Sequence, residues 1–195
     1  MPKIVNHMER KHHIAEATWR VILKYGMKGA TVRKIAEEAG LSLGALRHYF
    51  STQRELLAFA MNLVKERVNA RIDAIIMRDL PPKEKIVTIL LELVPVDNNK
   101  MAEMEVWFAF TFYGKNAEEP FDAQYDGIFT GMSNLIEYLD QYGLLRDDLD
   151  KEVESERLYA LVDGLAMHAM LEPERLDGKR VVRVLTHHID SICKF

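Results

Sequence analysis

The stretch TVRKIAEEAGLSLGALRHYF, residues 31–50, contains the signals that decide the fold. Thr31 and Ser42 are hydroxyl residues of the kind that cap the N-termini of helices. Gly40 between them suits the left-handed conformation in which a helix commonly ends. The stretch therefore predicts two short helices joined by a tight turn. This is a helix-turn-helix, which presents its second helix to the major groove of DNA.

The second of these helices is expected over residues 43–49 and has two distinct faces. Leu46 and Phe50 are four residues apart, so both are expected to face the protein interior. Arg47 lies on the opposite side and is long enough to reach the acceptor edge of guanine. The small residues near the start of the helix allow close approach to bases. The outward positions are Leu43, Gly44, Ala45, Arg47, His48 and Tyr49.

Hydroxyl side chains around the same helix suit contacts with the DNA backbone. Hydroxyl groups and helix N-termini are good partners for phosphate oxygens, so we expect such contacts from Thr31, Ser42 and Tyr49. The alternative is a purely structural corner between two helices, with a solvated polar face. The coincidence of the turn, the two caps and the basic side chains favours DNA binding.

Charge is distributed unevenly along the chain. Residues 1–60 contain ten Lys and Arg against five Asp and Glu, a net charge of +5. Residues 61–195 contain 16 against 25, a net charge of −9. A basic small part joined to an acidic larger part is typical of a nucleic-acid-binding domain followed by a second domain, although chance variation in surface charge is an alternative. We predict domains over residues 1–52 and 53–195.

The rest of the chain also has the pattern of helices. Apolar residues recur at helical spacing, and no stretch alternates with the period of a β-strand. Gly and Pro residues divide the chain into about nine helices, so the predicted fold is all-α. The first helix is expected over 9–25, with Gly26 as its left-handed end and an apolar stripe of Ile14, Thr18, Val21, Ile22 and Tyr25. The others are expected over 32–39, 43–49, a segment after Ser51, Pro82 to the residue before Pro95, 99–113, 121–142, 151–171 and 179–193.

Composition and the absence of known motifs exclude several classes of protein. With 48% hydrophobic and 29% charged residues, the chain has the composition of a globular protein. Its single cysteine, Cys193, favours a reducing, cytoplasmic location. No apolar run approaches the roughly 18 residues that cross a bilayer, and the N-terminus has no secretory signal. No enzyme or cofactor motif is present, and the histidine pairs 12–13 and 187–188 are interpreted as solvated charge, because neighbouring helical residues point about 100° apart. We expect no enzyme activity, cofactor or metal.

The run WFAFTFY, residues 107–113, has more aromatic residues than one helical stripe needs. It forms either plain core or one wall of a ligand cavity. An acid, Glu103 or Glu105, that reached this cavity would favour a lipophilic cation, with the aromatic faces assisting. The candidate ligand-binding residues are Met104, Glu105, Trp107, Phe108, Phe112 and Met167.

Two further apolar stripes lie near the C-terminus, and each has two interpretations. They bury either against the chain's own helices or against a second copy of the chain, and the small residues Gly164 and Ala166 permit close helix approach. The stripes are Leu158, Leu161, Val162, Leu165 and Ala169, then Val181, Val182, Leu185, Ile189 and Ile192.

Residues about 10–57, from RKHHIAEATWRVILKYG through TVRKIAEEAGLSLGALRHYFSTQRELL, resemble the N-terminal domain of TetR-family transcriptional repressors. The ending ALRHYF and the segment ALVDGLAMHAML at 160–171 resemble the BetI-like, choline-responsive branch. The resemblance implies an all-helical homodimer with a DNA-binding domain of three helices, a pocket for a small-molecule inducer and two C-terminal helices that pair the subunits. It implies operator contacts from Thr31, Arg33, Ser42, Leu43, Gly44, Ala45, Arg47, His48 and Tyr49.

One position departs from the family pattern. The family usually has a phosphate-contacting Lys where this chain has Gln53, which can donate a hydrogen bond but has no charge; the next residue, Arg54, is the alternative contact.

The resulting hypothesis is a dimeric repressor that binds a pseudo-palindromic operator and is released by an inducer. The alternatives are an activator, a regulator without an inducer, or a helical enzyme or protein-interaction module.

Overall fold

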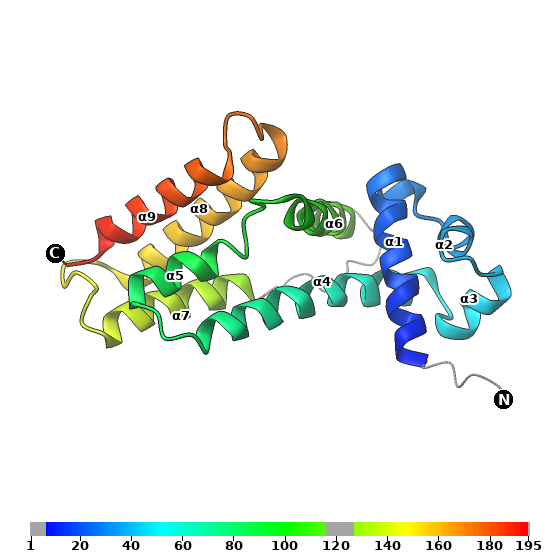
Figure 1. The fold of residues 1–195 in the computed structure, drawn as a ribbon, viewed down its shortest axis with the longest axis horizontal. Helices are drawn as coiled ribbons and strands as arrows, with labels where there is room; N and C mark the ends of the chain where they lie inside the picture. The colour runs from blue at the N-terminus through cyan, green and yellow to red at the C-terminus, as the bar shows by residue number, and fades with distance from the viewer. Residues whose placement is uncertain (1–6, 116–126, 195) are drawn as a thin grey trace. The chain divides into compact units, whose positions relative to one another are not determined.

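The computed structural model describes residues 7–115 and 127–194, which form nine helices and no strand (Figure 1). The prediction of an all-α fold is confirmed. The predicted start of the seventh helix at Phe121 lies outside the described residues. No helix in the described part of the chain is both long and apolar enough to span a lipid bilayer. The helices are α1 His7–Gly29, α2 Val32–Glu38, α3 Leu43–Tyr49, α4 Gln53–Ile76, α5 Pro82–Leu90, α6 Asn98–Lys115, α7 Ile128–Gln141, α8 Lys151–Leu171 and α9 Gly178–Ile192.

The first helix ends later than its sequence predicts. Gly26 has a φ of 65°, the left-handed conformation expected of it, but helical structure resumes after this kink and runs to Gly29. Tyr25 was expected on the buried stripe and is instead 47% exposed, so that part of the prediction is wrong. The kink comes directly after Tyr25. The Lys34 ammonium lies 4.2 Å from the centre of the Tyr25 ring.

The chain folds into two compact units. Of the described residues, the first unit contains 7–67 and 105–115, and the second contains 68–104 and 127–194. These ranges differ from the predicted domains because the first turns of α4 and the later turns of α6 share a core with α1–α3. The predicted division at residues 52 and 53 stays a prediction.

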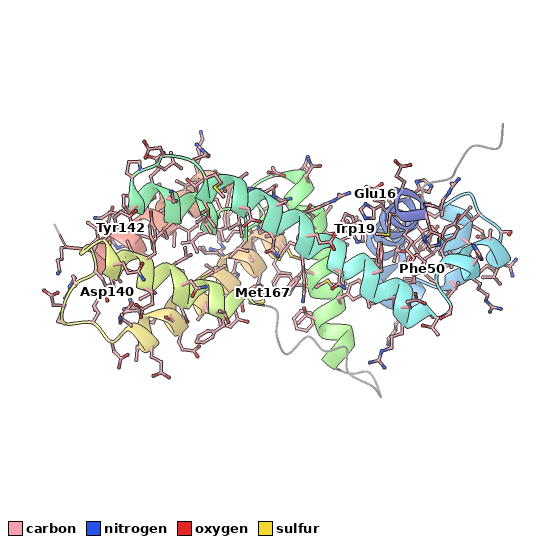
Figure 2. The ribbon with its side chains drawn as sticks, turned by 90° about the horizontal axis from the view of Figure 1, so that it is seen from below. Glu16, Trp19, Phe50, Asp140, Tyr142 and Met167 are labelled. Carbon is pink, nitrogen blue, oxygen red and sulfur yellow. The ribbon has the colours of Figure 1, made fainter. Side chains whose placement is uncertain are left out.

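The core of the first unit is built around α1. Trp19 is 8% exposed, and its indole N–H donates to the Ala60 carbonyl at 2.9 Å (Figure 2). A buried indole needs such a partner, because an unpaired N–H in the interior is costly. The guanidinium of Arg67 lies over the Trp19 ring and pairs with Glu16. These contacts join α1 to α4.

The second unit contains α5, α7, α8 and α9, with α7 packed on α8 and α5 packed on α9 and α7. Most of the two predicted C-terminal stripes lie in its core and are buried within the single chain: Leu158, Val162, Leu165, Ala169, Val181, Leu185, Ile189 and Ile192. Val182 is 40% exposed, so its assignment to the buried stripe is wrong. One residue of helix turns it about 100° away from Val181. A second copy of the chain would therefore have to use other faces of α8 and α9.

Two polar side chains are buried in the second unit without full hydrogen bonding. Glu154 of α8 is 4% exposed and accepts from Arg157 through Oε1 at 2.6 Å. Its Oε2 and the Nε2 of His188 on α9 have no hydrogen-bond partner. Burial lowers the pKa of His188, and so do the charges of Arg157 and His187, whereas the Glu154 carboxylate opposes them. The folded chain therefore favours a neutral imidazole at this position.

We expect the free energy of unfolding to decrease as the pH falls below the ordinary histidine value of 6.5. Because the folded-state pKa of His188 is lowered, the unfolded chain binds this proton more readily, and the stabilisation is complete only above the unfolded-state value. His188→Gln should reduce the pH slope in urea unfolding between pH 5 and 7.5, by at most about 1.4 kcal/mol per pH unit. The matched control is His187→Gln, because His187 is exposed on the same helix. Parallel curves for the wild type and His188→Gln would contradict the assignment.

Candidate nucleic-acid interface and ligand site

The caps and the turn of the helix-turn-helix form as the sequence predicts. Thr31 Oγ1 accepts from the backbone N–H of Lys34 at 3.3 Å, and Ser42 Oγ accepts from that of Ala45 at 3.1 Å. Gly40 has a φ of 66°, which the absence of a side chain makes accessible. Across it, the N–H of Leu41 donates to the Ala36 carbonyl at 2.9 Å. This bond closes α2 and directs the chain into α3.

Helix α3 has the two faces that its sequence predicts. Leu46 and Phe50 are 0% and 1% exposed and pack in the core of the first unit. Leu43, Gly44, Arg47 and His48 are exposed, and Ala45 and Tyr49 are half-buried. The positions predicted to read bases therefore lie on the accessible side of the helix.

Gly44 leaves space on this exposed face that no residue of the chain uses. A Cβ atom added at Gly44 would meet nothing closer than Ser42 Oγ, at 4.0 Å. Gly44 lies in the first turn of α3, where alanine is the better helix former, so the presence of glycine needs a reason. Packing within the chain supplies none, and the position is open to close approach by a partner.

The residues predicted to contact phosphates have hydrogen-bond donors that contacts within the chain leave available. The capping bonds use lone pairs of the Thr31 and Ser42 oxygens, so each O–H can still donate to an anion. Arg33 pairs with Glu37 at 3.2 Å, and both side chains are exposed. Such surface pairs contribute little stability, so the guanidinium can exchange this carboxylate for a phosphate.

Gln53 makes a contact within the chain that its sequence position does not indicate. Its Nε2 donates to the Ala30 carbonyl at 2.8 Å, which joins the start of α4 to the residue before the Thr31 cap. One N–H of the amide is therefore already used, although the side-chain amide has a second. Arg54, the other predicted contact here, is exposed. Phosphate contact by either residue stays a prediction.

The first turns of α1 contact the helix-turn-helix and α4 through residues that sequence reasoning missed. His13 Nε2 lies 3.2 Å from the Ala39 carbonyl, beside the α2–α3 turn. The His7 ring centre lies 4.9 Å from that of Tyr49, and the His12 ring packs beside Phe59 at 5.8 Å. His12 and His13 are exposed, as their interpretation as solvated residues predicts, and each also makes one contact within the chain. Only long-range packing reveals these roles, since the partners are tens of residues away.

The aromatic run on α6 is partly core and partly surface. Val106 and Phe110 are buried in the first unit, Trp107 and Phe108 are half-buried, and Phe112 is 59% exposed. The rings of Phe108 and Phe112 stack with centres 5.8 Å apart. The Tyr113 side chain lies outside the described residues.

The six candidate ligand residues come from both units. Glu105, which is exposed, belongs to the first unit with Trp107, Phe108 and Phe112. Half-buried Met104 and exposed Met167 belong to the second. Within the first unit, the Lys65 ammonium lies 5.6 Å from the centre of the Trp107 ring, so a cation of the chain already contacts one candidate aromatic.

Glu103, the other acid considered for this site, belongs to an ion-pair network in the second unit. Arg71 bonds both carboxylate oxygens of Glu103, at 3.2 and 2.8 Å, and also contacts Glu92 at 2.6 Å. Lys100 contacts the other oxygen of Glu92 at 2.9 Å. The Glu103 bonds raise the pKa of Arg71, which partial burial alone would lower. The two cations balance the two carboxylates, so Glu103 does not supply an unpaired charge to a ligand.

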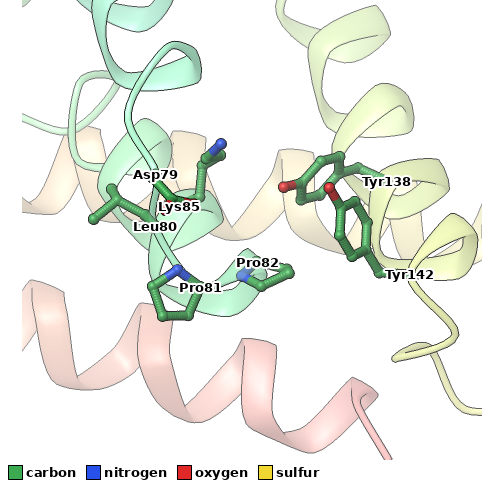
Figure 3. Close-up of a pocket in the computed structure, with 7 residues that line it drawn as sticks. All are labelled: Asp79, Leu80, Pro81, Pro82, Lys85, Tyr138 and Tyr142. Atoms are coloured by element: carbon green, nitrogen blue, oxygen red, sulfur yellow. The ribbon is translucent and has the colours of Figure 1, made fainter.

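A surface cavity of about 410 Å³ lies elsewhere in the second unit (Figure 3). The Tyr138 and Tyr142 rings, 4.7 Å apart, form one side of it. Lys85 on the other side donates to the Ile76 carbonyl at 3.1 Å. The sequence did not indicate this cavity, because its lining comes from segments more than 50 residues apart. The lining residues are Asp79, Leu80, Pro81, Pro82, Lys85, Tyr138 and Tyr142.

Two protein families match successive parts of the chain. Residues 14–59 match the family of bacterial regulatory proteins called tetR, and residues 82–194 match the C-terminal family of BetI-type transcriptional repressors. Over 193 residues the chain is 62% identical to the HTH-type transcriptional regulator PksA of Bacillus subtilis, covering 99% of this chain and 94% of the relative. It is 28% identical to the HTH-type transcriptional regulator BetI of Escherichia coli, covering 97% and 96%.

Solved structures with the same fold span almost the whole chain. A transcriptional regulator from Rhodococcus sp. Rha1 superposes with a TM-score of 0.80 at 28% identity, covering 93% of this chain and 95% of that one. A protein from Saccharomonospora viridis, solved in complex with choline, superposes with a TM-score of 0.85 at 21% identity, covering 96% and 100%. The named relatives are transcriptional regulators and not enzymes.

Proposed function

Because this chain belongs to the TetR family of bacterial transcriptional regulators, we propose that it is a homodimeric repressor whose operator is released by a small-molecule inducer. The observation that carries the DNA-binding part is the capped α2–turn–α3 element, whose exposed face holds Arg47 and the open position at Gly44. A regulator of this kind acts on the chromosome, so we place it in the cytoplasm.

The predicted contact residues have side chains suited to two roles. We propose that the exposed residues of α3 read bases, with Arg47 as the main one. Thr31, Ser42 and Tyr49 position the helix on phosphates, with Arg33 and Arg54 adding charge. The proposal is supported by the exposure of Thr31, Arg33, Ser42, Arg47 and Arg54, whereas Tyr49 is half-buried.

Salt-dependent retention on duplex DNA tests this function. Each phosphate neutralised by Lys or Arg releases condensed counterions, so affinity should fall steeply with salt. Fragments of the native genome selected by the protein should share a pseudo-palindrome, with half-sites about 10 bp or a multiple apart. Absence of salt-dependent binding would instead support a helical protein-interaction module.

The outward face of α8 supports the dimer. Three large apolar side chains on it are exposed: Val153 at 52%, Met167 at 41% and Leu171 at 68%. Between them lie Ala160 and Gly164, which permit close approach of a second helix. Ala160, Gly164, Met167 and Leu171 are four, three and four residues apart, and Val153 lies seven residues before Ala160, so all five lie on one side of the helix and form a stripe. We propose that this stripe, rather than the stripes buried within the chain, contacts the second subunit.

The aromatic residues of α6 support the inducer. We propose that the ligand contacts Trp107, Phe108 and Phe112, with Glu105 of the same unit as a further contact. Met104 and Met167, the other residues predicted from the sequence, belong to the second unit and carry no part of this proposal. A lipophilic cation is the class that Glu105 favours, and it would have to replace Lys65 at the Trp107 ring. Choline in the structure from Saccharomonospora viridis makes quaternary amines a natural part of a ligand screen.

We expect an inducer to change Trp107 fluorescence and to weaken operator binding about 5- to 150-fold, the range of a typical allosteric coupling. The measurement uses a Trp19→Phe variant, in which Trp107 is the remaining tryptophan. The screen compares quaternary amines with neutral and anionic lipophiles. A cationic inducer should bind more tightly after Lys65→Met, which removes its competitor, and more weakly after Glu105→Gln. The opposite response to Lys65→Met would identify an anionic ligand. A Trp107 fluorescence that no compound changes would contradict the proposal that the inducer contacts the aromatic residues of α6.

A further inference from the structure

Three aromatic rings meet at the C-terminal end of α3. The centre of the His7 ring, in the first turn of α1, lies 4.9 Å from that of the Tyr49 ring, with the two planes tilted by 40°. The His48 ring meets Tyr49 edge-on at 5.5 Å, and His7 and His48 are 6.4 Å apart. Two of the three rings belong to the proposed DNA contacts, whereas His7 comes from another helix and has no assigned role.

The position of His7 restricts what the Tyr49 side chain can do. Tyr49 is half-buried at the last position of α3, where the following residue, Phe50, leaves the helix with an extended backbone. A tyrosine at a helix end has several accessible rotamers, and only some direct the hydroxyl toward a phosphate. The His7 ring from α1 and the His48 ring from α3 both contact the Tyr49 ring, which reduces this freedom before DNA arrives. Preorganisation of this kind lowers the entropy lost on binding.

The helix that carries His7 is itself firmly attached to the helix-turn-helix. His13, less than two turns further along α1, lies within hydrogen-bond distance of the Ala39 carbonyl. The Lys11 ammonium lies 4.9 Å from the centre of the Phe50 ring, which is buried directly after Tyr49. The start of α1 and the end of α3 therefore pack together, and the contacts of Lys11 and His13, which follow His7 on α1, hold the His7 ring near Tyr49.

We propose that His7 is a positioning residue for operator binding, which holds the Tyr49 ring so that its hydroxyl donates to a DNA phosphate. The inference rests on the proposed function, since it needs an operator for Tyr49 to contact. His7 acts here through its ring and not through its charge. Its loss should therefore weaken specific and non-specific DNA alike, because phosphate contacts do not depend on sequence.

A double-mutant cycle on the full chain tests this inference. His7→Ala should weaken binding to operator duplex about 2- to 12-fold, the range that corresponds to the loss of one aromatic pair. In a Tyr49→Phe background, which has lost the hydroxyl, His7→Ala should have no further effect. His7→Phe keeps a ring and should restore wild-type affinity. His12→Ala is the matched control, since His12 is on the same helix but packs on Phe59, and it should leave affinity within twofold.

The outcomes separate this inference from the function on which it rests. If the wild-type protein shows no salt-dependent binding to duplex DNA, the proposed function itself fails. Suppose that the wild-type protein binds, but His7→Ala reduces operator affinity by the same factor with and without the Tyr49 hydroxyl. His7 then acts independently of Tyr49, and the inference is overturned. Failure of His7→Phe to restore affinity, together with a smaller salt dependence, would overturn it in favour of a direct charged contact. Thermal melting of each variant checks that a loss of DNA affinity is not caused by unfolding.

Discussion

Gly164→Glu is expected to produce a folded monomer whose affinity for its operator is reduced about 100-fold or more. A Cβ atom added at Gly164 meets nothing within 4 Å in the single chain, so the side chain has room in the monomer. On the proposed stripe of α8, however, it would place a charge where the second subunit packs. A dimer gains from holding two half-sites at once, and linkage of this kind is commonly worth 10²- to 10⁴-fold. Sedimentation and operator titration measure the two effects.

The same substitution elsewhere gives a matched control. Gly131 on α7 is also a helical glycine with nothing within 4 Å of an added Cβ. Both changes replace a poor helix former by a good one, so both should raise the melting temperature slightly. Only Gly164→Glu should dissociate the dimer. A dimeric Gly164→Glu protein with normal operator affinity would exclude the α8 stripe from the interface.

Leu185→Glu should behave differently from Gly164→Glu. Leu185 is 0% exposed in the core of the second unit, and an unpaired carboxylate there costs several kcal/mol. We therefore expect unfolding rather than a stable monomer, with specific DNA binding lost as a consequence. The contrast between the two variants distinguishes residues buried within the chain from those on the proposed subunit interface.

Arg47→Ala is expected to reduce affinity for the specific operator by about 1–3 kcal/mol, or 5- to 150-fold, and to leave non-specific DNA binding nearly unchanged. Arg47 is exposed on α3, so its removal opens no cavity and should not alter stability. The measurement is a pair of titrations, with operator and with unrelated duplex, at one salt concentration.

Comparison with a phosphate contact sharpens this test. Tyr49→Phe removes one hydroxyl and should weaken both kinds of DNA to a similar extent. If Arg47→Ala also weakened both alike and reduced the salt dependence, Arg47 would be a phosphate contact instead. The fold would then remain as described, while base reading would have to come from other residues of α3.

The helix-turn-helix was predictable because its signals are local. The Thr31 and Ser42 caps bond backbone groups three residues ahead, and the Gly40 turn closes within six residues. The periodicity of α3 likewise predicts its buried side, because one turn of helix relates Leu46 to Phe50. The same reasoning found the special conformation at Gly26 but not the further turn of helix after it. A left-handed glycine specifies its own dihedral angles and not what the chain does next.

The ligand site was less predictable because its contacts are distant in sequence. Glu103 is close in sequence to the aromatic run of α6, yet Arg71, 32 residues earlier, holds its carboxylate. Lys65 lies over Trp107 although the two are 42 residues apart in the sequence. Nothing in the spacing of either pair indicates the contact. It arises because α4 and α6 come together in the fold.

By itself, the sequence determined the all-α fold, the capped DNA-binding element and the residues that α3 exposes. It also showed that α8 and α9 have apolar stripes, but not what covers them. Only the tertiary structure decided that Leu158, Val162 and Leu185 bury within one chain, which leaves a different face of α8 for a second subunit. The physical reason is that periodicity records which side of a helix avoids water, whereas the partner that excludes the water is chosen by packing between segments far apart in the chain.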